Sequence, residues 1–287
     1  MRSNHAPFFF GIPAIVWQIL LFYIPIFLLI VGSIVQWQSN TWIPEITLKK
    51  FIFFLHPTYL RIIAASLLLS FSNALICFLI AYPLAHFIAF RGKKWGNLLL
   101  FLLIVPFWTN FLLHVYAWFF VLEKHGLINT ILLSLHLVET PILFLNSLFS
   151  TMIMMVYYYM PFMLLPIYAS LEKFDTKLIE ASYDLGASKF QTLIKILLPL
   201  SARGIKTGFF LVYIPSFGEF AIPELMGGDR YMFVGTVVSE FILGDETGSL
   251  GAAFTVLSCV CLFLSALLLY PILTSLLQPR FTEKKCS

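Results

Sequence analysis

The sequence predicts an all-α, polytopic membrane protein with six transmembrane helices. Hydrophobic residues make up 60% of its 287 residues and charged residues only 11%, which is not the balance of a water-soluble globule. The longest runs without Asp, Glu, Lys or Arg each exceed the roughly 20 residues that a helix needs to cross a bilayer. These runs are apolar on every side, whereas the strands of a membrane β-barrel alternate. They cover residues 6–44, 62–90, 96–122, 140–171 and 247–278.

A sixth span follows from the distribution of positive charge. Residues 207–226 are apolar but contain Glu219 and Glu224. If this segment crosses the membrane, most of the 18 Lys and Arg residues lie on the same side as both chain termini. Cytoplasmic loops carry such an excess of positive charge. We therefore expect both termini in the cytoplasm, and we interpret the net charge of +4 as a topology signal that implies no nucleic-acid partner.

These spans divide the chain into three parts. The first helix and its external loop occupy residues 1–61, a core of five helices occupies 62–277, and a cytoplasmic tail occupies 278–287. A long cytoplasmic loop is expected at 172–206, between the fourth and fifth spans. In chain order, the spans are expected near residues 10–36, 62–90, 97–122, 146–171, 205–226 and 250–277.

The cytoplasmic segment 172–206 is predicted to form two helices that meet at Gly186. Glycine suits the left-handed conformation that commonly closes a helix. Ser188 and Gln191 have the spacing of a capping box, which would start the second helix. Pro199 would end that helix, because proline lacks the backbone N–H that a helix interior needs.

Acidic residues on the first of these helices favour a protein partner over a lipid surface. Leu178, Ala181 and Leu185 recur at helical spacing and give one apolar stripe. Glu180 and Asp184 are four residues apart and share a helix face. An amphipathic helix lying on lipid is the alternative, but these carboxylates would face an anionic leaflet. Docking into the groove of a soluble protein is the better match.

The same residues resemble a known family. The pattern Glu-Ala-(Ala/Ser), then glycine, then Ile-x-Leu-Pro resembles the coupling-loop signature of permease subunits in binding-protein-dependent ABC importers. Ser182 departs from the usual second alanine, a change of one small residue for another. The resemblance implies that this loop docks onto an ATPase subunit. The expected docking residues are Glu180, Ala181, Ser182, Asp184, Gly186, Ile196, Leu198 and Pro199.

The similarity extends over nearly the whole chain. Residues 99–110, 171–175, 184–189 and 215–228 look like spermidine/putrescine permease subunits of the PotB/PotH type. This resemblance implies a type I ABC importer permease (MetI-like) fold in a bacterial inner membrane. It also implies a second permease subunit, so that a heterodimer encloses the path, two ABC ATPase subunits and an extracytoplasmic polyamine-binding protein.

We expect a non-catalytic subunit with no catalytic and no metal-binding residues. The chain contains no G-x-x-x-x-G-K-[ST] phosphate loop, so ATP and Mg would bind the partner ATPase. No metal-spaced set of His and Asp and no nucleophile–base pair occurs in the spans. His86 and His114 lie in spans without nearby carboxylates in sequence, and we expect them to be satisfied core histidines.

A polyamine path would need groups that stabilise ammonium ions inside the bilayer. A carboxylate within a span costs roughly 2.5–3.5 kcal/mol on insertion scales and usually faces a bundle interior or a wet cavity. Glu219 is the strongest candidate because it lies mid-span, between Pro215 and Pro223. Aromatic faces can hold ammonium groups for about 0.5–2 kcal/mol each. The candidate path residues are Glu219, Trp108, Tyr158, Phe217, Glu224 and Asp229.

Two alternatives remain open at this stage. The same importer architecture could carry another small cation, an amino acid or an Fe(III)-type ligand. A proton-coupled secondary transporter or a channel that acts alone belongs to a different class. Such a protein would need no cytoplasmic docking loop and more ionisable groups within its spans.

Overall fold

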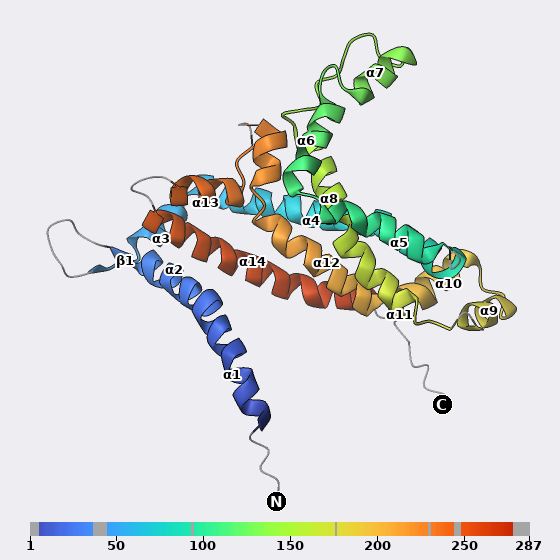
Figure 1. The fold of residues 1–287 in the computed structure, drawn as a ribbon, viewed down its shortest axis with the longest axis horizontal. Coiled ribbons are helices and arrows are strands. Elements are labelled where there is room, and N and C mark those ends of the chain that lie inside the picture. The colour runs from blue at the N-terminus through green and yellow to red at the C-terminus, as the bar shows by residue number, and fades with distance from the viewer. Residues whose placement is uncertain are drawn as a thin grey trace, which may run out of the picture. The chain divides into compact units, whose positions relative to one another are not determined.

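The chain is almost entirely helical, which confirms the all-α prediction. The computed structural model describes residues 6–36, 45–92, 95–175, 177–228, 231–243 and 248–277 (Figure 1). The chain forms two compact units. Unit 1 comprises Met1–Ile63 and Val234–Cys261, and unit 2 comprises Ala64–Phe233 and Leu262–Ser287.

Unit 1 begins with a helix that is apolar all round. It consists of α1 (Ala6–Gln18), the π-helical turn η1 (Ile19–Tyr23) and α2 (Ile24–Ile34). Its 23 residues Ile12–Ile34 are long and apolar enough to cross a membrane, and no part of their most apolar stretch is buried. A surface of this kind suits contact with lipid.

A short hairpin follows the first span and is fastened by Lys50. Strand β1 (Val35–Gln36) pairs antiparallel with β2 (Glu45–Ile46), with Val35 opposite Ile46. Lys50 is the second residue of α3 (Lys49–Phe54) and is only 6% exposed. Its Nζ donates to the carbonyl oxygens of Val35 at 2.7 Å and Gly32 at 3.3 Å. The side chain thereby satisfies carbonyls that the end of α2 leaves without helical partners.

The core of unit 1 is an aromatic cluster around the fully buried Phe54. Its ring centroid lies 4.8 Å from that of Tyr59, 5.0 Å from Phe254 and 5.6 Å from Phe241. These rings join α3 to three further elements. Edge-to-face and tilted aromatic pairs add to the stabilisation that burial of the rings gives. The further elements are α4 (Pro57–His86), α13 (Val234–Leu243) and α14 (Gly248–Leu277).

Unit 2 is organised around α8 (Leu148–Leu171). This helix carries the largest set of fully buried apolar side chains, namely Met154, Met155, Met163, Leu164, Ile167 and Leu171. The other elements of unit 2, besides parts of α4 and α14, are η2 (Phe87–Arg91), α5 (Gly96–Ile104), η3 (Val105–Trp108), α6 (Phe111–Leu122), α7 (Leu127–Ser134), α9 (Lys177–Asp184), α10 (Lys189–Thr192), η4 (Leu193–Leu197), α11 (Leu198–Leu200), α12 (Ala202–Phe217) and η5 (Pro223–Gly227).

Two glycines let α12 lie directly against α8 (Figure 1). A Cβ atom at Gly204 would collide with the carbonyl oxygen of Pro166, and one at Gly208 would lie 2.9 Å from the carbonyl oxygen of Met163. The two glycines are four residues apart and therefore share one face of α12. Small residues at this spacing allow two helix backbones to approach closely, as is common in membrane proteins.

The six-span prediction agrees with the lengths of the helices. Within the described residues, five helices are long and apolar enough to cross a membrane. The sixth candidate is a bent pair, Lys189–Leu200 and Ala202–Phe217, whose halves differ in direction by 70°. The number of candidate spans meets the expectation, although one of them, Phe111–Ser134, extends beyond the expected third span of 97–122.

The expected third span, 97–122, is wrong as a continuous helix. Helix α5 and the 3₁₀ turn η3 end at Trp108, and α6 starts at Phe111. The side-chain oxygen of Asn110 accepts a hydrogen bond from the N–H of Leu112, so Asn110 caps a new helix. Hydropathy does not register this break, because the flanking residues stay apolar.

The expected fifth span, 205–226, is also interrupted. Helix α12 starts at Ala202 and ends at Phe217, and the chain is non-helical from Gly218 to Phe220 before it coils again into η5. Glu219 therefore lies just beyond a helix end and not in the middle of a helix. The last turn of α12 is fixed by a buried hydrogen bond of 2.7 Å from Asn73 Nδ2, on α4, to Ser216 Oγ.

Candidate functional site

The loop between α8 and α12 is a compact helix–turn–helix. Gly186 has a φ of +80°, the left-handed conformation predicted for it. The N–H groups of Gly186 and Ala187 donate to the carbonyl oxygens of Tyr183 and Ser182, which closes α9. The predicted capping box is also confirmed, since Ser188 Oγ accepts from the N–H of Gln191 and Gln191 Oε1 accepts from the N–H of Ser188.

A pair of buried hydroxyl groups joins the two helices of this loop. Ser182 on α9 is 4% exposed and Thr192 on α10 is 1% exposed. Their side-chain oxygens lie 2.9 Å apart. Ser182 was expected among the docking residues, but its side chain faces the interior of the loop. The pair therefore connects α9 to α10 within the loop.

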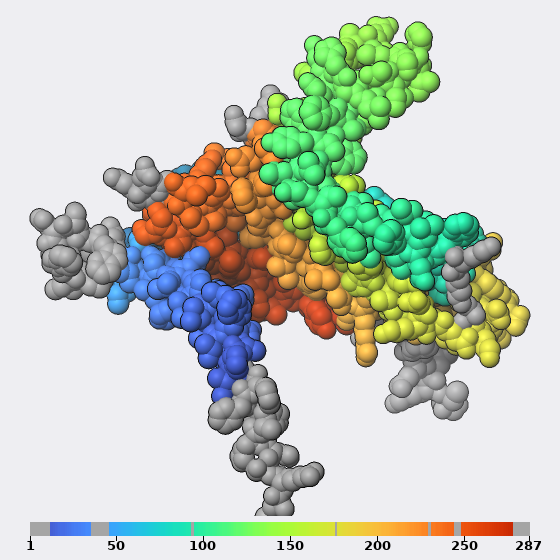
Figure 2. Space-filling view, viewed as in Figure 1, coloured from blue at the N-terminus to red at the C-terminus, as the bar shows by residue number. Residues whose placement is uncertain are grey.

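The outer surface of the loop is apolar with carboxylates beside it. Figure 2 shows the yellow segment that contains α9 and α10 at the surface of unit 2. Glu180, Ala181 and Asp184 are exposed. The large apolar side chains that lie open on α9, on its C-terminal turn and on the second helix are Leu178, Leu185, Phe190 and Ile194, with exposed fractions of 50%, 89%, 69% and 45%. Exposed apolar side chains with a polar surround are typical of a protein interaction surface.

The second helix continues through η4 and α11 into a sharp corner. Ile196, Leu198 and Pro199 are partly buried along this arm, which ends at Leu200. At the corner, Ser201 is fully buried and its Oγ donates to the carbonyl oxygen of Leu197 at 2.7 Å. The chain then turns by 70° into α12. The loop is therefore continuous in structure with the helix that leads to Glu219.

Glu219 is held by two neutral donors. Its Oε2 accepts from the hydroxyl of Tyr159, on α8, at 2.9 Å. Its Oε1 accepts from the backbone N–H of Ala221 at 3.2 Å. Tyr159 is 5% exposed, whereas Glu219 is half-buried. The carboxylate therefore has a fixed position and keeps part of its surface open.

Aromatic rings surround the partner of Glu219. The ring of Tyr159 lies 5.3 Å from that of Tyr158 and 6.2 Å from that of Phe162. Phe107, on η3, lies 5.7 Å from Tyr158 and 5.8 Å from Phe162, and Phe111, on α6, lies 5.0 Å from Tyr158. We refer to Phe107, Phe111, Tyr158, Tyr159 and Phe162 as the aromatic cluster.

The structure brings together only part of the predicted path. Tyr158 and Glu219 both contact Tyr159, the first through its ring and the second through its carboxylate. Trp108 is 79% exposed, outside the aromatic cluster, and Phe217 is buried at the end of α12. Glu224 is exposed on η5. Asp229 lies outside the described residues.

Sequence reasoning missed most of the aromatic cluster. Tyr159 belongs to the run Tyr157–Tyr158–Tyr159, and the sequence does not reveal which of these hydroxyls contacts Glu219. His114 is a satisfied core histidine, as expected. It is 7% exposed, its Nε2 contacts the Thr109 hydroxyl and its Nδ1 lies 3.2 Å from the hydroxyl of Tyr157.

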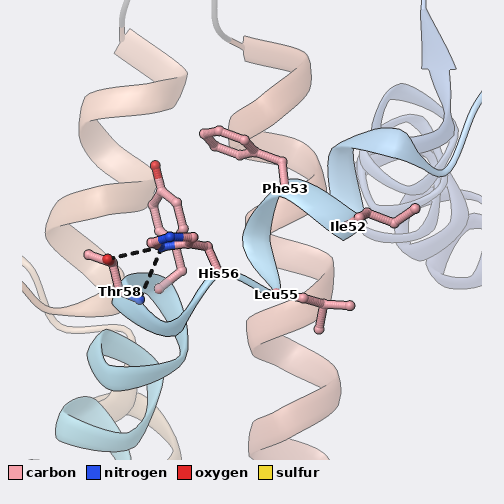
Figure 3. A pocket seen from close by; sticks show the side chains of 6 residues that line it. Ile52, Phe53, Leu55, His56 and Thr58 are labelled. Carbon is pink, nitrogen blue, oxygen red and sulfur yellow. Dashed lines mark hydrogen bonds between the residues drawn. The ribbon is translucent and has the colours of Figure 1, made fainter.

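A pocket in unit 1 is less suited to a cation. Its volume is about 640 Å³ and it is lined by Ile52, Phe53, Leu55, His56, Thr58 and Tyr59 (Figure 3). His56 Nδ1 accepts from the backbone N–H of Thr58 at 3.4 Å and lies 3.1 Å from its hydroxyl. The lining contains no carboxylate. Among the described residues, no group of three or more His, Cys, Asp or Glu side chains could hold a metal ion.

The fold and the helix–turn–helix loop define a class, namely polytopic membrane permeases. The model of the family "Binding-protein-dependent transport system inner membrane component" matches residues 78–283. This match covers more than half of the chain, and the chain belongs to that family. It is therefore an inner-membrane component of a transport system.

Named relatives match over most of their length. The chain is 37% identical over 241 residues to the spermidine/putrescine transport system permease protein PotB of Escherichia coli K12, covering 84% of this chain and 88% of the relative. It is 35% identical over 246 residues to the protein of the same name in Haemophilus influenzae, covering 85% and 86%.

A solved structure confirms the fold. A chain of a bacterial ABC transporter involved in the import of the acidic polysaccharide alginate matches with a TM-score of 0.73. The match covers 94% of this chain and 95% of that chain at 17% sequence identity. The chain therefore has the fold of an ABC importer permease.

Proposed function

We propose that this chain is a transmembrane permease subunit of an ATP-driven polyamine importer. The observation that carries the proposal is the 37% identity to the E. coli spermidine/putrescine permease over 84% of this chain. The fold alone does not select the cargo, since the alginate importer shares it. A carboxylate beside aromatic rings is a chemistry that suits ammonium groups.

Energy would reach this subunit through the loop between α8 and α12. The chain has no phosphate loop of its own, so we place ATP and Mg on two ABC ATPase subunits. The exposed apolar side chains of the loop would dock into a groove on the surface of one of these ATPase subunits. The 70° corner at Ser201 links this contact to α12. This subunit would then be non-catalytic, and it would transmit movement of the ATPase through the loop to α12.

A second permease subunit would complete the path. The chain is 30% identical over 112 residues to the spermidine/putrescine transport system permease protein PotC of E. coli K12, which covers 38% of this chain. Similarity to two differently named permeases of one kind of system supports a pair of related subunits. An extracytoplasmic polyamine-binding protein would supply the substrate, and the charge distribution favours cytoplasmic termini.

Uptake by the reconstituted system tests this function. The chain is co-purified with its associated subunits, which are identified, and placed in proteoliposomes with the binding protein. We expect ATP-dependent accumulation of radiolabelled spermidine or putrescine that unlabelled polyamines suppress and amino acids or Fe(III) chelates do not. Suppression of uptake by an amino acid or an Fe(III) chelate would change our assignment of the cargo. Accumulation by the chain alone, without a nucleotide hydrolase, would instead identify a secondary transporter.

A further inference from the structure

We propose that Glu219 and the aromatic cluster form one half of an ammonium-binding site on the translocation path. The proposed ligand is a flexible cation whose ammonium groups are separated by methylene chains. This inference rests on the proposed function, and it assigns the substrate contact to particular side chains. Tyr159 is a positioning residue in this site, because its hydroxyl fixes Glu219 Oε2 at 2.9 Å.

The first argument is the position of two helix interruptions. The chain leaves helical geometry at Thr109–Asn110 and again at Gly218–Phe220. The aromatic cluster links them, since Phe107 and Phe111 flank the first interruption and Tyr159 bonds Glu219 in the second. Irregular backbone at membrane depth is tolerated only where protein buries it or where it lines a water-filled cavity. Discontinuous helices at substrate sites follow the same principle.

The second argument is the unused hydrogen-bonding capacity of Glu219. An ionised carboxylate has about four acceptor positions. Tyr159 O–H and Ala221 N–H occupy two of them. Within the described part of the chain, these are the carboxylate's hydrogen-bond partners, and no cation pairs with it. A half-buried carboxylate held only by neutral donors can therefore accept further bonds from a charged donor, which are stronger than neutral ones.

The third argument is the composition of the cluster. Phe107, Phe111 and Phe162 have no polar atoms, and Phe162 is 41% exposed. Methylene groups can pack on such rings, and an ammonium group can lie over a ring face. The cluster therefore suits an alkyl chain that carries separated charges.

A purely structural role for Glu219 makes a different prediction. Its bond to the N–H of Ala221 could serve only to start the helical turn before η5. Glutamine has nearly the same shape. Its Oε1 can accept from the N–H of Ala221 while its Nε2 donates to the hydroxyl oxygen of Tyr159, so Glu219→Gln can keep both contacts, with the direction of one bond reversed, and lose the charge. The variant consequently separates the two roles.

The experiment is ATP-driven uptake by the complete importer in proteoliposomes, with uptake and ATP hydrolysis measured together. We expect E219Q to lower spermidine uptake per ATP by roughly tenfold or more, because a hydrogen bond to a charged group is among the stronger ones. Glu219→Asp should retain more uptake than E219Q. Glu139→Gln, which removes an exposed negative charge elsewhere in unit 2, should match wild type.

A second variant covers the case in which E219Q fails to assemble. Phe107→Leu keeps an apolar side chain and removes a ring, and we expect a several-fold loss of uptake. Wild-type uptake in E219Q, or in F107L if E219Q does not assemble, would overturn the site and leave the proposed function intact. A wild-type complex that imports no polyamine would overturn both.

Discussion

The side-chain oxygen of Ser182 on α9 lies 2.9 Å from that of Thr192 on α10, and both residues are buried. Each hydroxyl also lies near a carbonyl oxygen of its own helix, Ile179 at 2.7 Å and Ser188 at 3.1 Å. The family signature usually has alanine at the position of Ser182. In this chain the extra hydroxyl has a partner, so the two helices of the loop are bonded across the Gly186 turn.

We expect the Ser182–Thr192 pair to stabilise the loop as a unit. Ser182→Ala and Thr192→Val should each cost about 1 kcal/mol, and the double variant should cost less than the two losses added together. Hydrogen exchange of the α9 and α10 amides measures the effect. Ser134→Ala, on the exposed end of α7, is the matched control and should leave exchange unchanged. Strictly additive losses would show that the two hydroxyls act independently.

Substitution of Gly186 tests its backbone conformation. A Cβ atom there would meet nothing within 4 Å, so only the φ of +80° limits the choice of residue. Gly186→Pro, which requires a φ near −65°, should abolish substrate-stimulated ATP hydrolysis and transport while the chain still inserts. Gly186→Asn should retain both, since asparagine visits the left-handed region. Equal activity of the two variants would argue against a required turn.

The contact between α8 and α12 should be intolerant of a single added methyl group. Gly204→Ala would press against the Pro166 carbonyl, and Gly208→Ala against that of Met163. Overpacking of this kind costs about 1–3 kcal/mol, which thermal melting in detergent can detect. Gly32→Ala is the control, because a Cβ atom there meets nothing within 4 Å. A lower melting temperature for the control than for G204A would contradict this account.

Lys50 should make the stability of unit 1 depend on alkaline pH. Burial lowers the pKa of Lys50 below its ordinary value of 10.5. The unfolded chain then binds this proton more tightly than the folded chain, so stability should rise as the pH increases from the lowered pKa towards 10.5. Melting temperatures measured across this range should rise in wild type and in Lys49→Met, an exposed neighbour. Lys50→Met should lack this rise in melting temperature. Parallel curves of melting temperature against pH for all three proteins would refute the role of Lys50.

Local features of this protein could be predicted from its sequence. The left-handed Gly186 and the Ser188–Gln191 box depend on residues within one or two turns of each other, and both predictions are confirmed. The all-α fold follows from the length of the apolar runs. The interruption at Thr109–Asn110 was missed because a hydropathy run averages over a capped helix start.

The long-range part of the site could not be predicted. Tyr159 and Glu219 are 60 residues apart, and their pairing depends on how α8 is rotated about its axis. Rotation by one residue, about 100°, distinguishes Tyr159 from Tyr158. That rotation is fixed by tertiary packing, including the glycines of α12 against α8. Trp108 was a reasonable candidate by composition, but it is 79% exposed and lies outside the cluster.

The corner at Ser201 joins two helical arms whose directions differ by 70°, so a tilt of one arm would redirect the other. Helix α12 has 16 residues, so it is about 24 Å long, and a swing of about 5° about its Ser201 end would carry the opposite end sideways by roughly 2 Å. Glu219 lies two residues past that opposite end. A small displacement of the loop arm would therefore reach the carboxylate as a sideways shift in its position.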